Sequence, residues 1–109
     1  MYNGLNGTGA VNSVNGAVGT VVTRIRAANK SVATSAWQSN TTYADYPYRA
    51  SVSISGVTAD MIPDVMFSLE QINEGIYAPV AESYSGGVYI YASSVPAAAI
   101  TIPMIEVRA

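Results

Sequence analysis

Short runs in which apolar and polar residues alternate, each closed by glycine or proline, are the feature that most limits the folds open to this chain. Such alternation is clearest over residues 48–55, where the apolar positions are Tyr48, Ala50, Val52 and Ile54. A period of two residues is the period of a β-strand, whose successive side chains point to opposite faces of a sheet. The run therefore predicts a strand with one buried face and one face of Arg49 and serine hydroxyls, ended by Gly56.

The same pattern recurs along the chain. Further strands are predicted over residues 20–26, 65–67, 80–84, 88–92 and 100–107, with residues 27–34 either a linker or another short strand. Ser85-Gly86-Gly87 between two of these runs is a hairpin signal. The last run changes the parity of its apolar positions at Pro103, which predicts a bulge or an edge position there. The expected core residues on the facing sheets are Val52, Ile54, Phe67, Ile90 and Ile102.

Only one helix is predicted. Ser68 and Gln71 have the spacing of a capping box, and Gly75 stands where a helix of one or two turns over residues 69–74 would end. We therefore expect an all-β fold, a small β-sandwich of about six to eight short strands with one short helical turn. The sandwich is expected over residues 36–109, and residues 1–35, with their Asn-Gly turns, are expected to form an extended stalk segment before it.

Charge is scarce. Charged residues make up 11% of the chain and the formal net charge is −2, whereas an average domain has ~25% charged residues. The five basic residues are scattered, so nucleic-acid binding is not expected. No apolar run approaches the ~18 residues of a membrane span, so membrane insertion is not expected. A surface with so few charges is poorly protected from association, which favours an oligomer over a neutral monomer covered by serine and threonine.

The residues needed for common catalytic sites are missing. The chain has no histidine and no cysteine, which removes the usual base of nucleophilic sites and the usual zinc ligands. Glu70 and Glu74 lie four residues apart on the predicted helix, and Asp60 and Asp64 bracket a proline turn, so structural roles are favoured over catalytic pairs. Together with Asp45, the aspartates lack the spacing of a calcium loop. We expect no enzymatic activity, no metal and no cofactor.

Aromatic residues gather in the middle of the chain. Trp37 and Tyr48 are expected in the core, whereas Tyr43 and Tyr46 fall in a polar loop. Aromatic faces stack on apolar ring faces and polar side chains bond hydroxyl groups, so the loop is a candidate sugar-binding site. The candidate ligand-binding residues are Asn40, Tyr43, Asp45 and Tyr46. The alternative is that the loop tyrosines only cover a sheet edge.

A second set of residues is expected on an outward surface. Tyr89 and Tyr91 alternate with Val88 and Ile90, so they point away from the core, either to a subunit interface or to an exposed binding face. The candidate interface residues are Val21, Ile25, Tyr89 and Tyr91.

Two stretches carry a resemblance to bacteriophage fibre proteins. "VNSVNGAVGTVV", residues 11–22, resembles a short motif repeated in such fibres, carried here by Val11, Val14, Asn15, Gly16, Gly19 and Val21. Family copies often continue into "Leu-Thr-x-x-Asp-Val-Gly-Ala", whereas "VVTRIRAANKSV" stands here. Residues 37–107 look like the small C-terminal β domains of tail-fibre, head-fibre or baseplate proteins of phages with Gram-positive hosts. The carriers are Trp37, "YPYRASVSISGVTADMIPDV" and "VYIYASSVPAAAITIPMIEV".

The resemblance implies a non-enzymatic structural protein at the virion surface, usually a homotrimer, whose partners are other virion proteins. It implies a fibre tip domain that attaches to a host cell-surface glycan. The alternative is a purely structural capsid decoration, head fibre or fibre-assembly domain that binds no receptor. A carbohydrate-binding module of a secreted enzyme is a third possibility, which would require a catalytic partner.

Overall fold

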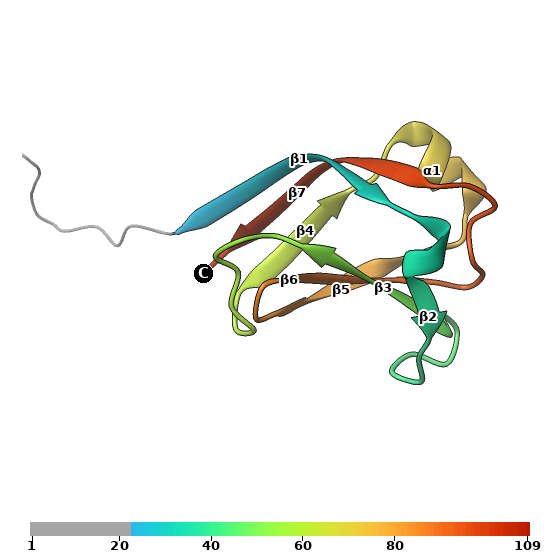
Figure 1. Ribbon diagram of the computed structural model, residues 1–109, viewed down its shortest axis with the longest axis horizontal. Helices are drawn as coiled ribbons and strands as arrows, with labels where there is room; N and C mark the ends of the chain where they lie inside the picture. Colours follow the sequence, from blue (N-terminus) through green and yellow to red (C-terminus); the bar gives the residue numbers. More distant parts are fainter. Residues whose placement is uncertain (1–22) are drawn as a thin grey trace, which may run out of the picture.

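The computed structural model describes residues 23–109, which form two antiparallel β-sheets packed as two layers (Figure 1). The three-stranded sheet has the order β1 (Arg24–Val32), β7 (Ile100–Arg108), β4 (Ile62–Met66). The four-stranded sheet has the order β2 (Trp37–Ser39), β3 (Tyr48–Ser53), β6 (Gly87–Ala92), β5 (Tyr77–Tyr84). One helical turn, η1 (Thr34–Ala36), and one helix, α1 (Leu69–Glu74), complete the fold. The predicted all-β class with a short helix is confirmed.

The core lies between the two sheets. Its most deeply buried side chains come from the central strands β3, β6 and β7: Ala50, Val52, Val88, Ile90, Ala92, Ile102, Ile105 and Val107. Removing one of these valine or isoleucine side chains from water contributes about 1.5–3 kcal/mol. Burial of Val52, Ile54, Ile90 and Ile102 is confirmed. Phe67 is only half-buried because it follows β4 at the margin of the core, which corrects the expected burial.

The last strand changes the face that it turns to the core, as the sequence predicted. Ile102 and Ile105 are both 0% exposed although they lie three residues apart, so the alternation is reset between them. The pairing of β7 with β1 passes over Pro103 and Asn29, and Asn29 has φ 53°, a left-handed conformation that asparagine tolerates. The register of β7 with β1 is the same on both sides of Pro103, and β7 is the central strand, so neither the bulge nor the edge position expected at Pro103 is found.

The first described strand belongs to the sandwich. β1 pairs with β7 from Arg24 opposite Arg108 to Val32 opposite Ile100. β1 contains residues 24–26 of the strand expected over residues 20–26 and continues through residues 27–32, so the expected boundary at residue 36 is wrong for β1. Residues 20–22 lie outside the described residues. Figure 1 shows β1 running alongside β7 as one edge of its sheet. The fibre-like motif at residues 11–22 lies outside the described residues.

The predicted capping box forms at the start of α1. Gln71 N donates to Ser68 Oγ at 3.2 Å, and Ser68 N donates to Gln71 Oε1 at 3.0 Å. Gly75 ends the helix with φ 70°. Gln71 is buried, and its Nε2 donates to the carbonyl oxygen of Thr101 at 2.8 Å. Because β4 pairs with β7 only as far as Met104, this bond satisfies a β7 carbonyl beyond the end of β4.

Gly87 is the position where the sheet tolerates no side chain. A Cβ there would collide with the carbonyl oxygen of Val52 and lie 2.6 Å from Tyr84 Oη. We expect Gly87→Ala to lower the free energy of unfolding in urea by ~2 kcal/mol or more, because the backbone of β3 cannot move aside. Ser85→Ala in the same hairpin is the control and should change it by less than ~0.5 kcal/mol. Equal stability of the two variants would contradict this packing of β3 against β6.

Candidate functional site

The outer face of the four-stranded sheet carries a cluster of aromatic and charged side chains. We call it the tyrosine face; it consists of Tyr43, Arg49, Glu82, Tyr84, Tyr89 and Tyr91. Because Val88, Ile90 and Ala92 point into the core, the alternation along β6 turns its two tyrosines outward. The sheet register then places Arg49 of β3 opposite Tyr91 and Glu82 of β5 opposite Tyr89.

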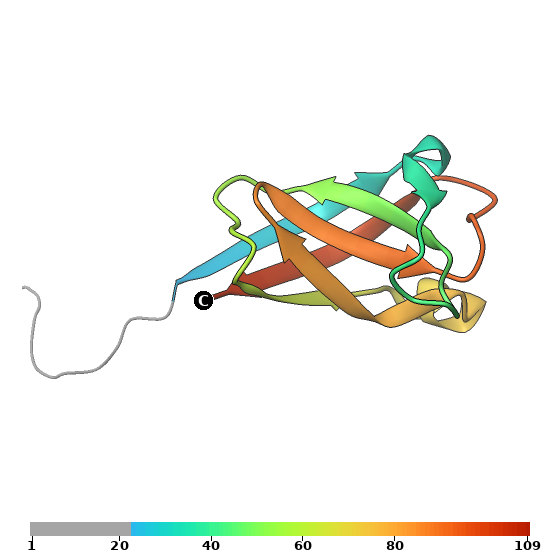
Figure 2. The ribbon, with the colours of Figure 1, turned by 90° about the horizontal axis from the view of Figure 1, so that it is seen from below.

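One half of the tyrosine face is a hydrogen-bonded group around a carboxylate. Tyr43 Oη donates to Glu82 Oε2 at 2.7 Å, and Tyr91 Oη donates to Glu82 Oε1 at 2.5 Å. The rings of Tyr43 and Tyr91 meet edge to face, with centroids 4.8 Å apart and planes at 86°. These contacts fasten the loop between β2 and β3 onto the outer face of the sheet, and Figure 2 shows that loop crossing β6.

The pKa values in this group move in opposite directions. Hydrogen bonds from Tyr91 and Tyr43 hold the pKa of Glu82 below its ordinary value. Burial, followed by the bond to Glu82, raises the pKa of Tyr91, and the bond to Glu82 raises the pKa of Tyr43. At neutral pH the group is therefore an ionised carboxylate held by two neutral phenols, with both carboxylate oxygens occupied.

The other half of the tyrosine face is a stack of half-exposed groups. The guanidinium carbon of Arg49 lies 3.9 Å from the ring centroid of Tyr89. The ring of Tyr84 packs against the ring of Tyr89, with the two ring centroids 4.3 Å apart and the ring planes at 24°. Tyr84 lies close over Gly87, which has no side chain to displace it. This half presents aromatic surface, guanidinium donors and the exposed Ser51 and Ser53 of β3, a combination suited to a ligand with apolar ring faces and hydroxyl groups.

Only one of the four candidate ligand-binding residues in the loop belongs to the tyrosine face. Tyr43 is part of it, whereas Asn40 shapes the loop: its Oδ1 accepts from Thr42 N at 3.0 Å. Asp45 is exposed and Tyr46 is half-exposed. Neither side chain makes a described hydrogen bond or ring contact with the tyrosine face. The structure thus moves the centre of the candidate site from the loop to the sheet.

Three members of the tyrosine face were not among the residues expected at a site: Arg49, Glu82 and Tyr84. The outward parity of Arg49 was visible in the alternation of residues 48–55. The two β5 residues were findable in principle, since a hairpin through Ser85-Gly86-Gly87 pairs β5 with β6.

Two expected interface residues are used inside the chain. Tyr91 is 1% exposed because Tyr43 and Glu82 cover it, so its outward orientation does not make it available to a partner subunit. Ile25 is partly buried against the core. Tyr89 remains half-exposed beneath Arg49 and Tyr84, and Val21 lies outside the described residues.

One member of each acidic pair considered for catalysis has a local hydrogen-bond partner. Asp60 Oδ1 accepts from Thr58 Oγ1 at 2.5 Å, and Glu74 Oε1 accepts from Tyr77 Oη at 3.0 Å. Within residues 23–109, no three side chains of the metal-binding types gather closely enough to hold an ion. None of the helices in this range has the length and apolar character to cross a membrane.

No protein-family model, curated protein or solved structure matches this chain.

The network around Glu82 makes part of the stability depend on pH. The folded pKa of Glu82 is depressed, so its contribution is present above the unfolded pKa and is lost as pH falls through the folded value. We expect Glu82→Gln to lower the free energy of unfolding at pH 7 by about 1–2 kcal/mol. The loss should shrink between about pH 5 and pH 3, where the parent loses the same bonds. Thermal unfolding across this range checks it, with the exposed Glu70→Gln as control. A constant difference at every pH would contradict the prediction.

Proposed function

We propose that this chain is a non-enzymatic attachment domain of a bacteriophage fibre that binds a host cell-surface polysaccharide through the tyrosine face. The observation that carries the binding role is the gathering of Arg49, Tyr84 and Tyr89 as half-exposed neighbours on one sheet face. The fibre context rests on the resemblance of residues 11–22 and 37–107 to phage fibre proteins. In that context the domain is a homotrimer at the virion surface.

The chemistry of the face favours a neutral sugar. The carboxylate of Glu82 already accepts two hydrogen bonds from tyrosine hydroxyls, so it has little capacity left for a cationic ligand. Aromatic rings stack on the C–H faces of sugar rings, and Arg49 with Ser51 and Ser53 can bond sugar hydroxyls. By analogy with other aromatic pairs, one such stack contributes ~1 kcal/mol.

Binding at one such site is expected to be weak. A millimolar dissociation constant corresponds to only ~4 kcal/mol of binding free energy, which a few contacts of this kind supply. Several copies held on one fibre, facing a repetitive polysaccharide, raise the avidity by about 10²–10⁴. The proposed function therefore needs an oligomer as much as it needs the tyrosine face.

A purely structural role in fibre assembly or capsid decoration is the second candidate. It is favoured by the exposed apolar side chains on β4, α1 and β5, among them Met66, Ile72 and Val80. Under that function the tyrosine face only fastens the loop between β2 and β3 and binds no sugar.

Replacement of the exposed rings tests the attachment function. We expect the double variant Tyr84→Ala/Tyr89→Ala to bind host cells or purified cell-wall polysaccharide at least ~10-fold more weakly than the parent, which corresponds to ~1.4 kcal/mol. The matched control is Tyr46→Ala, which removes a ring of the same type outside the cluster and should keep binding within ~2-fold. Melting temperature and solution mass are compared first. Equal binding by the double variant and the parent would remove the tyrosine face from the site. No binding by the parent would favour the structural role.

A further inference from the structure

An apolar groove of about 270 Å³ opens where the margins of the two sheets part, between β4, α1 and β5. It lies where β5 shifts its register with β6 between Tyr77 and Ala81. Its apolar lining includes Val65, Phe67, Ile72 and Ala81. Five exposed large apolar side chains lie on the same three elements. Ile72 and Val80 are part of the groove lining, whereas Ile62, Met66 and Leu69 lie outside it. A concentration of exposed apolar groups on one side of a small domain is typical of an interaction surface.

Two carboxylates lie at this groove. Asp64 of β4 is part of its lining, and Glu74 of α1 accepts a hydrogen bond from Tyr77, which is also part of the lining. Both carboxylates are exposed, and no ion pair within residues 23–109 includes either of them. We call the groove together with Asp64 and Glu74 the acidic edge.

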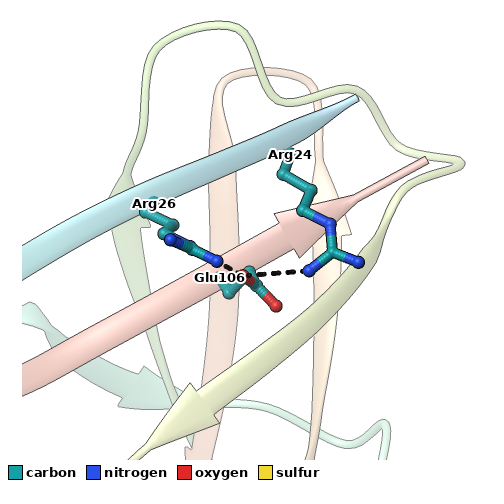
Figure 3. Close-up of polar contacts among 3 residues, drawn as sticks. All are labelled: Arg24, Arg26 and Glu106. Atoms are coloured by element: carbon teal, nitrogen blue, oxygen red, sulfur yellow. Dashed lines mark hydrogen bonds and ion pairs between the residues drawn. The ribbon is translucent and has the colours of Figure 1, made fainter. Parts of the chain in front are cut away.

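The opposite edge of the same three-stranded sheet is basic. β1 carries Arg24, Arg26 and Lys30, three of the five basic residues of the chain. Arg26 Nε donates to Glu106 Oε2 at 2.8 Å, and a terminal nitrogen of Arg24 lies 3.7 Å from the same oxygen (Figure 3). One carboxylate thus serves two guanidinium groups, both of which stay more than half exposed. Lys30 lies opposite the buried Ile102, so it projects from the other face of β1 than Arg24 and Arg26. We call these three residues of the edge strand the basic edge.

We propose that this chain binds a second copy of itself head to tail, with the basic edge of one copy against the acidic edge of the next. Two acidic edges placed together would bring carboxylates against carboxylates, whereas this arrangement pairs unlike charges. The alkyl stems of arginine and lysine cover apolar surface while their charged ends reach carboxylates, so the basic edge fits both parts of the acidic edge.

The contact is made through side chains and does not extend the sheet. Pro63 in β4 and the left-handed Asn29 in β1 interrupt the two edges, and such interruptions oppose continuous strand pairing. A head-to-tail contact generates a closed ring when its rotation closes. This inference rests on the proposed function for the oligomer that it describes. It uses no residue of the tyrosine face, so loss of self-association and loss of sugar binding are measured separately.

Sedimentation equilibrium of the full 109-residue chain tests the apolar part of the contact. We expect a mass above that of the 11.4 kDa monomer, and weaker association when salt is raised from ~50 mM to ~500 mM, where charges are screened more strongly. Ile72→Ser should shift the chain toward monomer. Val95→Ser, an exposed residue outside the groove lining, is the matched control and should leave the mass unchanged. A parent that sediments as a monomer throughout would overturn the proposal.

Charge reversal tests the pairing of unlike edges. Lys30→Glu and Asp64→Lys, each alone, should raise the dissociation constant for self-association by ~10-fold, and the double variant should recover most of that loss. Association of the Lys30→Glu variant at parental strength would overturn the proposal, because it would show that the charge of Lys30 is not part of the contact. A double variant no better than the singles would also overturn it.

Discussion

β6 is buried on both of its faces, and the arrangement of the neighbouring strands and loops follows from this burial. Val88 and Ile90 on its inner face are at most 1% exposed and pack between the sheets. On its outer face Tyr91 is also 1% exposed, although no second layer of sheet covers it. Tyr91 can be buried there because its hydroxyl donates a hydrogen bond to Glu82 and its ring packs edge to face against Tyr43. Without these partners, a strand in this position would have one buried face and one face exposed to solvent.

The tyrosine face follows from that burial. Covering Tyr91 fixes the loop between β2 and β3 and occupies the only carboxylate of the cluster. The neighbouring Tyr89 is covered less completely, by Arg49 and Tyr84, and stays half-exposed. One strand thus supplies a buried, structural tyrosine and an accessible one. One half of the tyrosine face holds the loop between β2 and β3 on the sheet. Under the proposed function, the other half contacts the ligand.

The three-stranded sheet has a different character. Its central strand β7 buries Ile102, Ile105 and Val107 completely, and both neighbouring strands are edges. Because the chain has few charged side chains, the position of each one affects the charge pattern of the surface more than it would in an ordinary domain. Basic residues lie on β1, and carboxylates lie on β4 and α1 beside an apolar groove. The proposed self-association uses this separation, while the tyrosine face on the other sheet stays free for a ligand.

Local sequence patterns predicted the features that depend on neighbours along the chain. Alternation marked β3 and β6, Ser68 and Gln71 marked the start of α1, and the parity change at Pro103 marked the change of face along β7, because each signal lies within a few residues. The alternation of apolar and polar residues indicates which side chains share a face of a strand. It does not indicate what covers that face. Only the tertiary structure decided that β1 joins the sheet and that Tyr91 is buried. Those outcomes depend on contacts between distant segments, such as Arg26 with Glu106 and Tyr43 with Glu82, which bring together residues that no local pattern relates.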